Sequence, residues 1–337
     1  MTDGPTPAPP AALQLPYIDA IRAVAILMVV TIHAAAPDVV GSPVGTPLWW
    51  FANVLDSVSR PAVPLFLMVS GATLLAKAEP ARTFYTKRAS RILLPFLVWS
   101  GVFFVVHYGW ASTPLGFANS IVGDRIHYHL WFFYILIPLY VLTPLLRRGI
   151  AAVPTTYLVW FAVLAALLAD LNALAPRFSS HLGLDTSAFS VPLGFFVLGY
   201  VIAHRGWSFA WPLPLLGAAG LIIVGTYVLS ITGGTLDTFL YGPSGLANMV
   251  LTASLFVALS RRTRPTSRAV TSLASASFGI YLMHPLILDP LSRSLGDQYG
   301  QTPLAGAVIV TVLVITLGAS WIITALIGRI PGLRQLV

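Results

Sequence analysis

Residues 17–36 read YIDAIRAVAILMVVTIHAAA, an apolar run long enough to cross a bilayer that carries Asp19 and Arg22 at its start and His33 near its end. An α-helix rises about 1.5 Å per residue, so the span from Arg22 to His33 covers roughly 16 Å. At about 100° per residue the two side chains also return to nearly the same face. Ionisable groups inside a membrane are costly and usually functional. This face of the predicted helix therefore carries a cation near one membrane surface and a titratable imidazole well inside the membrane.

The composition extends this pattern to the whole chain. Of the 337 residues, 57% are hydrophobic and 9% are charged, whereas a soluble domain is about 25% charged. We therefore expect a polytopic membrane protein. Residues 1–16 lack Lys and Arg and are rich in proline, which argues against a signal peptide and predicts a disordered cytoplasmic tail. The sequence has no cysteine, which excludes disulfides, thiolate metal sites and a cysteine acyl-enzyme, and no metal is expected.

Apolar stretches close to the ~20 residues that span a bilayer predict ten helices. Residues 17–337 are thus expected to form one all-α domain, a bundle of about ten transmembrane helices. Prolines 61 and 64 in the second stretch, and 285 and 290 in the ninth, are expected to kink or break those helices. The sixth stretch is short. The stretches are 18–37, 48–76, 90–109, 129–146, 155–174, 190–204, 211–232, 244–261, 272–292 and 303–327.

The distribution of Lys and Arg predicts the orientation. With both termini cytoplasmic, fourteen basic residues fall in inner loops and ends, and only Arg125, Arg177 and Arg293 fall in outer loops. Such an excess on the cytoplasmic side is the general rule for membrane proteins. The net charge of +8 is therefore interpreted as an orientation signal rather than as a sign of a nucleic-acid partner. The inner residues are Lys77, Arg82, Lys87, Arg88, Arg91, Arg147, Arg148, Arg205, Arg261, Arg262, Arg264, Arg268, Arg329 and Arg334.

The first two predicted helices carry charged groups with two interpretations each. His33 suits a general base, because the ordinary pKa of imidazole is near neutrality, but a histidine that only packs between helices is equally common. Asp19 can pair with Arg22, as an anchor or as part of a ligand site. Asp56 and Arg60, at i and i+4, predict a structural ion pair, because an unpaired charge there would be expensive.

Three further groups are candidates for binding or catalysis. Arg88 and Arg91 would make a forked receptor for phosphates, although basic residues at a cytoplasmic helix end also follow from orientation alone. His127, His129 and Trp131 precede or open the fourth helix, where an acceptor-binding role competes with interfacial anchoring. The ninth helix carries Ser277, Tyr281 and His284, and Ser70 with Gly71 in the second permits close helix approach. His284 lies at roughly the depth of His33, which a common polar cavity would explain.

Five segments together resemble the integral-membrane acyltransferase family 3, whose members O-acylate bacterial surface polysaccharides and related envelope molecules using acyl-CoA. The segments lie within residues 19–286. The second and fourth are most similar to the branch that contains the enterobacterial common antigen O-acetyltransferase. The family fold is a ten-helix bundle. Many longer relatives add an extracytoplasmic hydrolase-like domain, which we expect this chain to lack. The segments are DAIRAVAILMVVTIH, SRPAVPLFLMVSG, KRASRILLP, HLWFFYILIPLYVLTPLLR and SFGIYLMHPL.

The resemblance implies a site and a reaction. Arg22 and His33 match the family's paired functional residues, and Arg88 and Arg91 match its Arg-x-x-Arg motif. An acyl-CoA donor, acetyl by family habit, would be held through its phosphates by the three arginines. His33 would act as general base on a hydroxyl of an extracytoplasmic glycan, glycolipid or lipid-linked acceptor, in the bacterial cytoplasmic membrane. The further catalytic candidate is His284, and the candidates for the acceptor or the oxyanion are Ser70, Tyr281, His129 and Trp131.

Two other classes of protein fit part of the pattern. A transporter or flippase of lipid-linked sugars or small solutes also needs charged residues around a cavity. A membrane sensor without turnover is the third class. The lack of visible internal repeats argues against the transporter, and the five segments argue against both. Direct transfer and transfer through a covalent acyl-enzyme both stay open.

Overall fold

The computed structural model describes residues 15–109, 113–180, 187–262, 266–299, 302 and 304–337. Across these residues the chain is helical and contains no strand. The 3-10 helices are η2 (Ala175–Phe178), η3 (Phe239–Tyr241) and η4 (Arg334–Leu336), and η1 (Ala89–Leu93) is a π-helix. The α-helices are α1 (Ile18–Gly41), α2 (Pro47–Ser59), α3 (Ala62–Leu74), α4 (Ala81–Arg88), α5 (Leu94–Tyr108), α6 (Pro114–Val122), α7 (Trp131–Ile150), α8 (Thr155–Leu174), α9 (Ser187–His204), α10 (Pro212–Gly233), α11 (Leu246–Ser260), α12 (Arg268–Tyr299) and α13 (Ala305–Ile327).

Eight helical segments of the described chain are long and apolar enough to cross a membrane. They correspond to eight of the ten predicted spans. The remaining two predictions fall on α9, which is short, and on residues 48–76, which form α2 and α3. A multi-pass, all-helical membrane protein is thus confirmed. The count of ten and the cytoplasmic termini stay predictions, and most of the predicted N-terminal tail lies outside the described residues.

The break between α2 and α3 falls at Arg60 and Pro61, where the sequence predicted a kink or break. Two hydrogen bonds between side chains and main-chain carbonyls stabilise this break. Asn248 donates its amide to the Arg60 carbonyl at 3.4 Å, and the Arg60 guanidinium donates to the carbonyl of Tyr241 at 3.0 Å. Arg60 also forms an ion pair with the buried Asp56. This pair neutralises two charges and stabilises the helix break, which is a structural role.

The short helices α3 and α9 cross closely in the interior. A Cβ atom added at Gly71 would overlap the main-chain carbonyl of Phe196, and one added at Gly199 would overlap that of Met68. Small residues at such a crossing let the two backbones touch, which is the usual way in which membrane helices associate. The crossing fixes α3, and α3 in turn carries Ser70.

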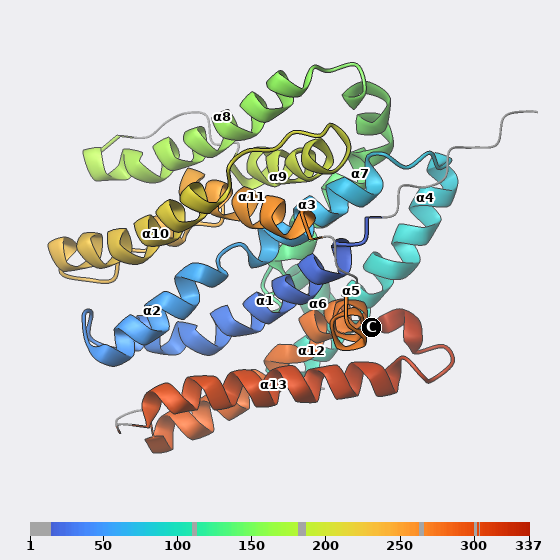
Figure 1. Ribbon diagram of the computed structural model, residues 1–337. Helices are drawn as coiled ribbons and strands as arrows, with labels where there is room; N and C mark the ends of the chain where they lie inside the picture. Colours follow the sequence, from blue (N-terminus) through green and yellow to red (C-terminus); the bar gives the residue numbers. More distant parts are fainter. Residues whose placement is uncertain (1–14, 110–112, 181–186, 263–265, 300–301, 303) are drawn as a thin grey trace, which may run out of the picture.

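The helix α1, which carries Arg22 and His33, lies among several other helices. It packs against α2, α3, α12 and α13. In Figure 1, α8 and α13 lie on opposite sides of the bundle, with α1 and α3 between them. Both Arg22 and His33 are thus held on a helix that is surrounded by other helices.

Prolines 285 and 290 do not break α12, which runs continuously through both. Pro285 lacks the N–H that would bind the carbonyl of Tyr281. The Nδ1 atom of His284 lies 2.8 Å from that carbonyl and 3.2 Å from the carbonyl of Ile280. Because a carbonyl only accepts, Nδ1 carries the proton and replaces the missing backbone donor. His284 therefore has a structural role in keeping α12 intact.

Candidate functional site

A cavity of about 630 Å³ lies where α1 begins and is lined by four arginines. Arg22 comes from α1, Arg88 from α4, Arg91 from η1 and Arg334 from η4. None of the described residues that line it is an Asp or a Glu. A cluster of guanidinium groups without a nearby carboxylate suits an anionic ligand. We call this space the arginine cavity.

Arg88 and Arg91, the two arginines of the Arg-x-x-Arg motif, lie where the α-helix changes into a π-helix. Arg88 is the last residue of α4, and the π-helix η1 that follows contains Arg91. Single π-turns inside α-helices are rare and often occur at functional sites. The Arg88 guanidinium lies over the rings of Phe84 and Tyr140, 5.2 and 5.7 Å from their centres. Its Nε atom is buried without a hydrogen-bond partner among the described residues, so no carbonyl or carboxylate of the described chain binds this donor.

Glu79, an acid that lies within electrostatic range of Arg88, is already paired. Glu79, in the loop before α4, accepts a hydrogen bond from the ammonium group of Lys87 at 2.5 Å. That bond holds the pKa of Glu79 below its ordinary value. The carboxylate is therefore occupied by Lys87 and does not neutralise Arg88 by direct contact.

The wall of the arginine cavity also presents hydroxyl groups. Arg22 donates to the Ser277 hydroxyl at 3.2 Å, and no salt bridge joins it to Asp19 in the described part of the chain. The hydroxyls of Ser70 and Tyr140 lie 3.3 Å apart. Asp19 therefore acts on Arg22 only through a longer-range attraction, and the hydrogen-bond partner of Arg22 is the neutral Ser277. Arg22 keeps its charge for the cavity.

His33 lies in a second group, the histidine cluster, formed by His33, Tyr128, His129, His284 and their neighbours. The His33 ring stacks on that of His284 with centres 5.2 Å apart, and the ring of Tyr128 lies 5.0 Å away on a tilted plane. The His129 ring is 5.5 Å from that of His284. His33 is half-buried and makes no hydrogen bond to a described residue, so its ring nitrogens are free to act on a ligand.

Asp289 orders the outer side of the histidine cluster. It accepts a hydrogen bond from the Tyr128 hydroxyl at 2.8 Å and faces Nε2 of His127 at 3.4 Å. The Nδ1 atoms of His127 and His129 are 2.9 Å apart, so one donates to the other. Burial and Asp289 raise the pKa of the Tyr128 hydroxyl, and burial among other histidines lowers the pKa of His129 well below its ordinary value. Tyr128 therefore stays a donor and His129 stays neutral.

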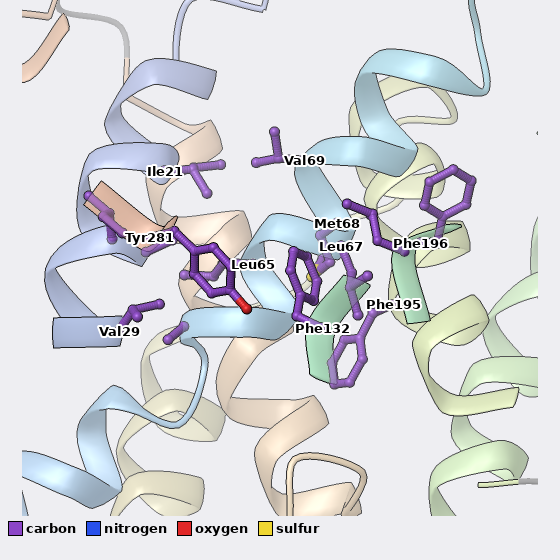
Figure 2. Packing of buried hydrophobic residues seen from close by; sticks show 14 of the residues in the cluster. Ile21, Val29, Leu65, Leu67, Met68, Val69, Phe132, Phe195, Phe196 and Tyr281 are labelled. Carbon is purple, nitrogen blue, oxygen red and sulfur yellow. The ribbon is translucent and has the colours of Figure 1, made fainter. Parts of the chain in front are cut away.

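Tyr281 connects the two groups. Its ring and that of Phe132 line the arginine cavity, while its hydroxyl donates to the main-chain carbonyl of His129. Figure 2 shows Tyr281 and Phe132 in the buried packing, together with Ile21 of α1 and Leu65 of α3. The ring of Tyr281 lies 5.5 Å from that of His129 and 5.7 Å from that of Phe132, so these two aromatic side chains form a wall between the arginine cavity and the histidine cluster.

The structure thus divides the predicted site residues. Those that line the arginine cavity are Arg22, Ser70, Arg88, Arg91 and Tyr281. Those in the histidine cluster are His33, His129 and His284, and none of these three is among the described residues that line the cavity. Trp131 belongs to neither group, because it borders a small apolar cleft beside α3 and α9.

Sequence reasoning missed four residues at the site. In the sequence, Arg334 is only one of the basic residues that indicate the orientation. Tyr128 and Tyr140 carry no specific signal there, because aromatic residues are common in membrane proteins. Asp289 carried a usable signal, because an acid inside an apolar helix, five residues after His284, is expensive unless it has partners.

The comparisons with known proteins give one family. A family model described as an acyltransferase domain, that of acyltransferase family 3, matches residues 15–325. No curated protein and no solved structure matches the chain. The matched residues include both the arginine cavity and the histidine cluster, except for the terminal turn η4.

Proposed function

We propose that this chain, which belongs to acyltransferase family 3, transfers an acyl group from acyl-CoA in the arginine cavity to a hydroxyl group that approaches His33. Family membership and the apolar helices make it a multi-pass membrane acyltransferase. The observation that carries the donor proposal is the convergence of Arg22, Arg88 and Arg91, from separate turns and helices, on one cavity without an acidic lining residue among those described.

Coenzyme A fits the charge of this cavity. A phosphomonoester and a diphosphate together carry roughly four negative charges at neutral pH. Arginine forks bind phosphate oxygens through charge-assisted hydrogen bonds, which are about twice as strong as neutral ones. Arg88 lines the cavity without a salt bridge to a described residue, while Arg22 is held in place by its hydrogen bond to Ser277. The nucleotide end of the donor would therefore lie at the arginines, with the pantetheine arm directed toward Tyr281 and Phe132.

The acyl-transfer step uses His33 as general base. The hydroxyl oxygen of the acceptor attacks the thioester carbonyl, His33 takes the hydroxyl proton, and the C–S bond breaks as the new C–O ester bond is complete. The proton then passes from His33 to the departing thiolate, which leaves as CoA thiol, so no net charge or proton is left on the protein. His284 and Tyr128 hold the His33 ring from two sides. This step requires the side chains of Tyr281 and Phe132 to move aside, so that the thioester carbonyl lies between Ser70 and His33.

Ser70 is the best placed of the candidate oxyanion donors. It lines the cavity on the rigid helix α3, and its hydroxyl is shared only with that of Tyr140. The hydroxyl of Tyr281 is committed to the His129 carbonyl. The proton of His284 is on Nδ1, so its buried Nε2 has a lone pair and cannot donate in this state. We therefore assign stabilisation of the tetrahedral intermediate to Ser70.

The acceptor and the cellular setting follow from the family resemblance. We propose an acetyl donor, an envelope glycan, glycolipid or lipid-linked sugar as acceptor, and the bacterial cytoplasmic membrane as the location, with the enterobacterial common antigen branch as the nearest group. The half-buried His33 and the exposed Tyr128 support entry of the acceptor from the side of the histidine cluster, opposite the arginine cavity.

The test is acyl-CoA-dependent release of CoA thiol by the purified protein in nanodiscs, supplied with an extract of envelope glycolipids. We expect His33→Ala to lower turnover by about 10²–10⁴-fold, the usual contribution of a general base. The double variant Arg88→Gln with Arg91→Gln should weaken donor binding, whereas Arg82→Gln, an exposed arginine of α4 that does not line the cavity, should not. Normal turnover in folded His33→Ala contradicts the base assignment. No CoA release by the wild type favours a transporter or sensor.

A further inference from the structure

The turn η4 contributes a fourth arginine to the cavity from the far end of the described chain. Arg334, Gln335 and Val337 all line the arginine cavity. Figure 1 shows the end of the chain lying beside α5 and α12, and not extending away from the bundle. After α13 ends at Ile327, the chain therefore returns to the donor side of the site.

Specific contacts hold this turn in place. The indole Nε1 of Trp99, in α5, donates to the main-chain carbonyl of Leu336 at 2.9 Å. On the other side, Val337 packs against Gly279 of α12 so closely that an added Cβ atom at Gly279 would lie 3.0 Å from the Val337 side chain. η4 also contacts η1, which carries Arg91. The turn is thus attached to α5, α12 and η1, and the last two of these line the cavity.

Arg334 itself is not committed to a protein partner. It is exposed, and no described residue forms a salt bridge or hydrogen bond with its guanidinium group. Its charge adds to those of Arg22, Arg88 and Arg91 around one space. Four like charges around a cavity repel one another unless an anion of comparable charge enters it. A ligand with a single carboxylate would leave most of that repulsion in place, whereas a nucleotide with several phosphates would cancel it.

We infer that η4 is part of the donor site and that Arg334 binds a phosphate at the nucleotide end of the acyl-CoA. This inference rests on the proposed function. In the bound state Arg22, Arg88 and Arg91 face the phosphates from α1, α4 and η1, and Arg334 faces them from η4, which lies beside η1. Trp99 is a positioning residue, because it acts only through the main chain of Leu336. The cavity thereby selects a polyphosphorylated donor over an acyl thioester that lacks the nucleotide.

The experiment is a titration of the purified full-length chain in nanodiscs with CoA, with dephospho-CoA and with pantetheine. Arg334→Gln should weaken CoA binding about ten-fold or more, the range expected for the loss of a hydrogen bond between charged groups. Arg329→Gln removes a like charge from the same exposed segment without touching the cavity, and it should leave CoA binding unchanged. Arg334→Lys should restore part of the affinity, because the charge returns without the fork.

Two further measurements separate a binding role from a structural one. Trp99→Phe keeps the ring but removes the donor to Leu336, and it should weaken CoA binding by a smaller factor than Arg334→Gln. Pantetheine, which has no phosphate, should bind equally weakly to wild type and to Arg334→Gln. If wild type and Arg334→Gln bind dephospho-CoA with equal affinity, Arg334 binds the 3′-phosphate. If wild type binds dephospho-CoA more tightly than Arg334→Gln does, Arg334 binds the diphosphate. Both results support the inference.

The outcomes also separate this inference from the proposed function. If wild type and Arg88→Gln both fail to bind CoA, the acyl-CoA donor itself is wrong. If CoA binds, and Arg88→Gln weakens it while Arg334→Gln behaves like Arg329→Gln, the donor proposal stands and the role of η4 is overturned. Equal weakening by Arg329→Gln and Arg334→Gln would also overturn it, because general surface charge would then explain the effect.

Discussion

Substituting Tyr281 by Phe removes one hydroxyl at the boundary between the arginine cavity and the histidine cluster. In the structure that hydroxyl donates to the main-chain carbonyl of His129, and both groups are buried. The substitution leaves the carbonyl without a partner, which costs about 1–3 kcal/mol of folding stability. Had the hydroxyl served the oxyanion, its loss would instead lower kcat by about 10²–10³-fold. We expect lower stability and a change in kcat below about ten-fold, because the hydroxyl is already engaged.

The assay compares unfolding and turnover of the same preparation. Unfolding of the detergent-solubilised protein is followed by intrinsic fluorescence, and kcat by CoA thiol release. Tyr134→Phe is the control, because it removes a tyrosine hydroxyl that likewise donates to a main-chain carbonyl, that of Ile121 in α6, outside the residues that line the cavity. It should destabilise without affecting kcat. A Tyr281→Phe protein with wild-type stability and a hundred-fold loss of kcat would show that the hydroxyl acts on the reaction and that our assignment to Ser70 is wrong.

Three further predictions concern stability. Gly71→Ala should destabilise by about 1–3 kcal/mol or more, because the new methyl group overlaps the carbonyl of Phe196; Gly101→Ala, with no atom within 4 Å of the added Cβ atom, should be neutral or stabilising in unfolding experiments. His129 has a lowered pKa, so stability should fall as pH drops below about 6.5, the ordinary value, and His129→Gln should flatten the dependence of Tm on pH. Asp56→Asn leaves a largely buried guanidinium group unpaired and should cost about 3 kcal/mol, measured as a lower midpoint of denaturation.

The sequence predicted the membrane class and most helices well, since long apolar runs are a local property. It also predicted a break at Pro61, yet it gave the same expectation for Pro285, where α12 continues. The difference lies in side chains. At Pro285 the neighbouring His284 donates to the carbonyl that the proline frees. At the break between α2 and α3, the Arg60 carbonyl lacks its helical donor because of Pro64, and Asn248 of the distant helix α11 donates to it instead. A pattern of residue types does not reveal which carbonyl finds a donor.

The sequence predicted how far apart Arg22 and His33 lie along α1, but not which side chains of other helices lie between them. The rise and rotation of α1 placed Arg22 and His33 on one stripe, and both are in the interior at different levels. Whether one open space joins the two side chains depends on which residues of other helices lie between them. In the structure these residues are Tyr281 of α12 and Phe132 of α7. The equal depth of His33 and His284 did indicate proximity, and their rings do stack. The contribution of Arg334 comes from the return of the chain after α13, which no local pattern encodes.

The wall between the two groups has a consequence for how donor binding and chemistry are linked. Turning the Tyr281 ring aside leaves the buried His129 carbonyl without its donor, which costs about 1–3 kcal/mol. Several charge-assisted bonds to phosphates supply more than that. A ligand shifts an equilibrium by its difference in affinity for the two states. If a bound pantetheine arm is accommodated only when the Tyr281 ring turns aside, phosphate binding at the arginines is sufficient to open the way to His33, and a donor without phosphates would leave it closed.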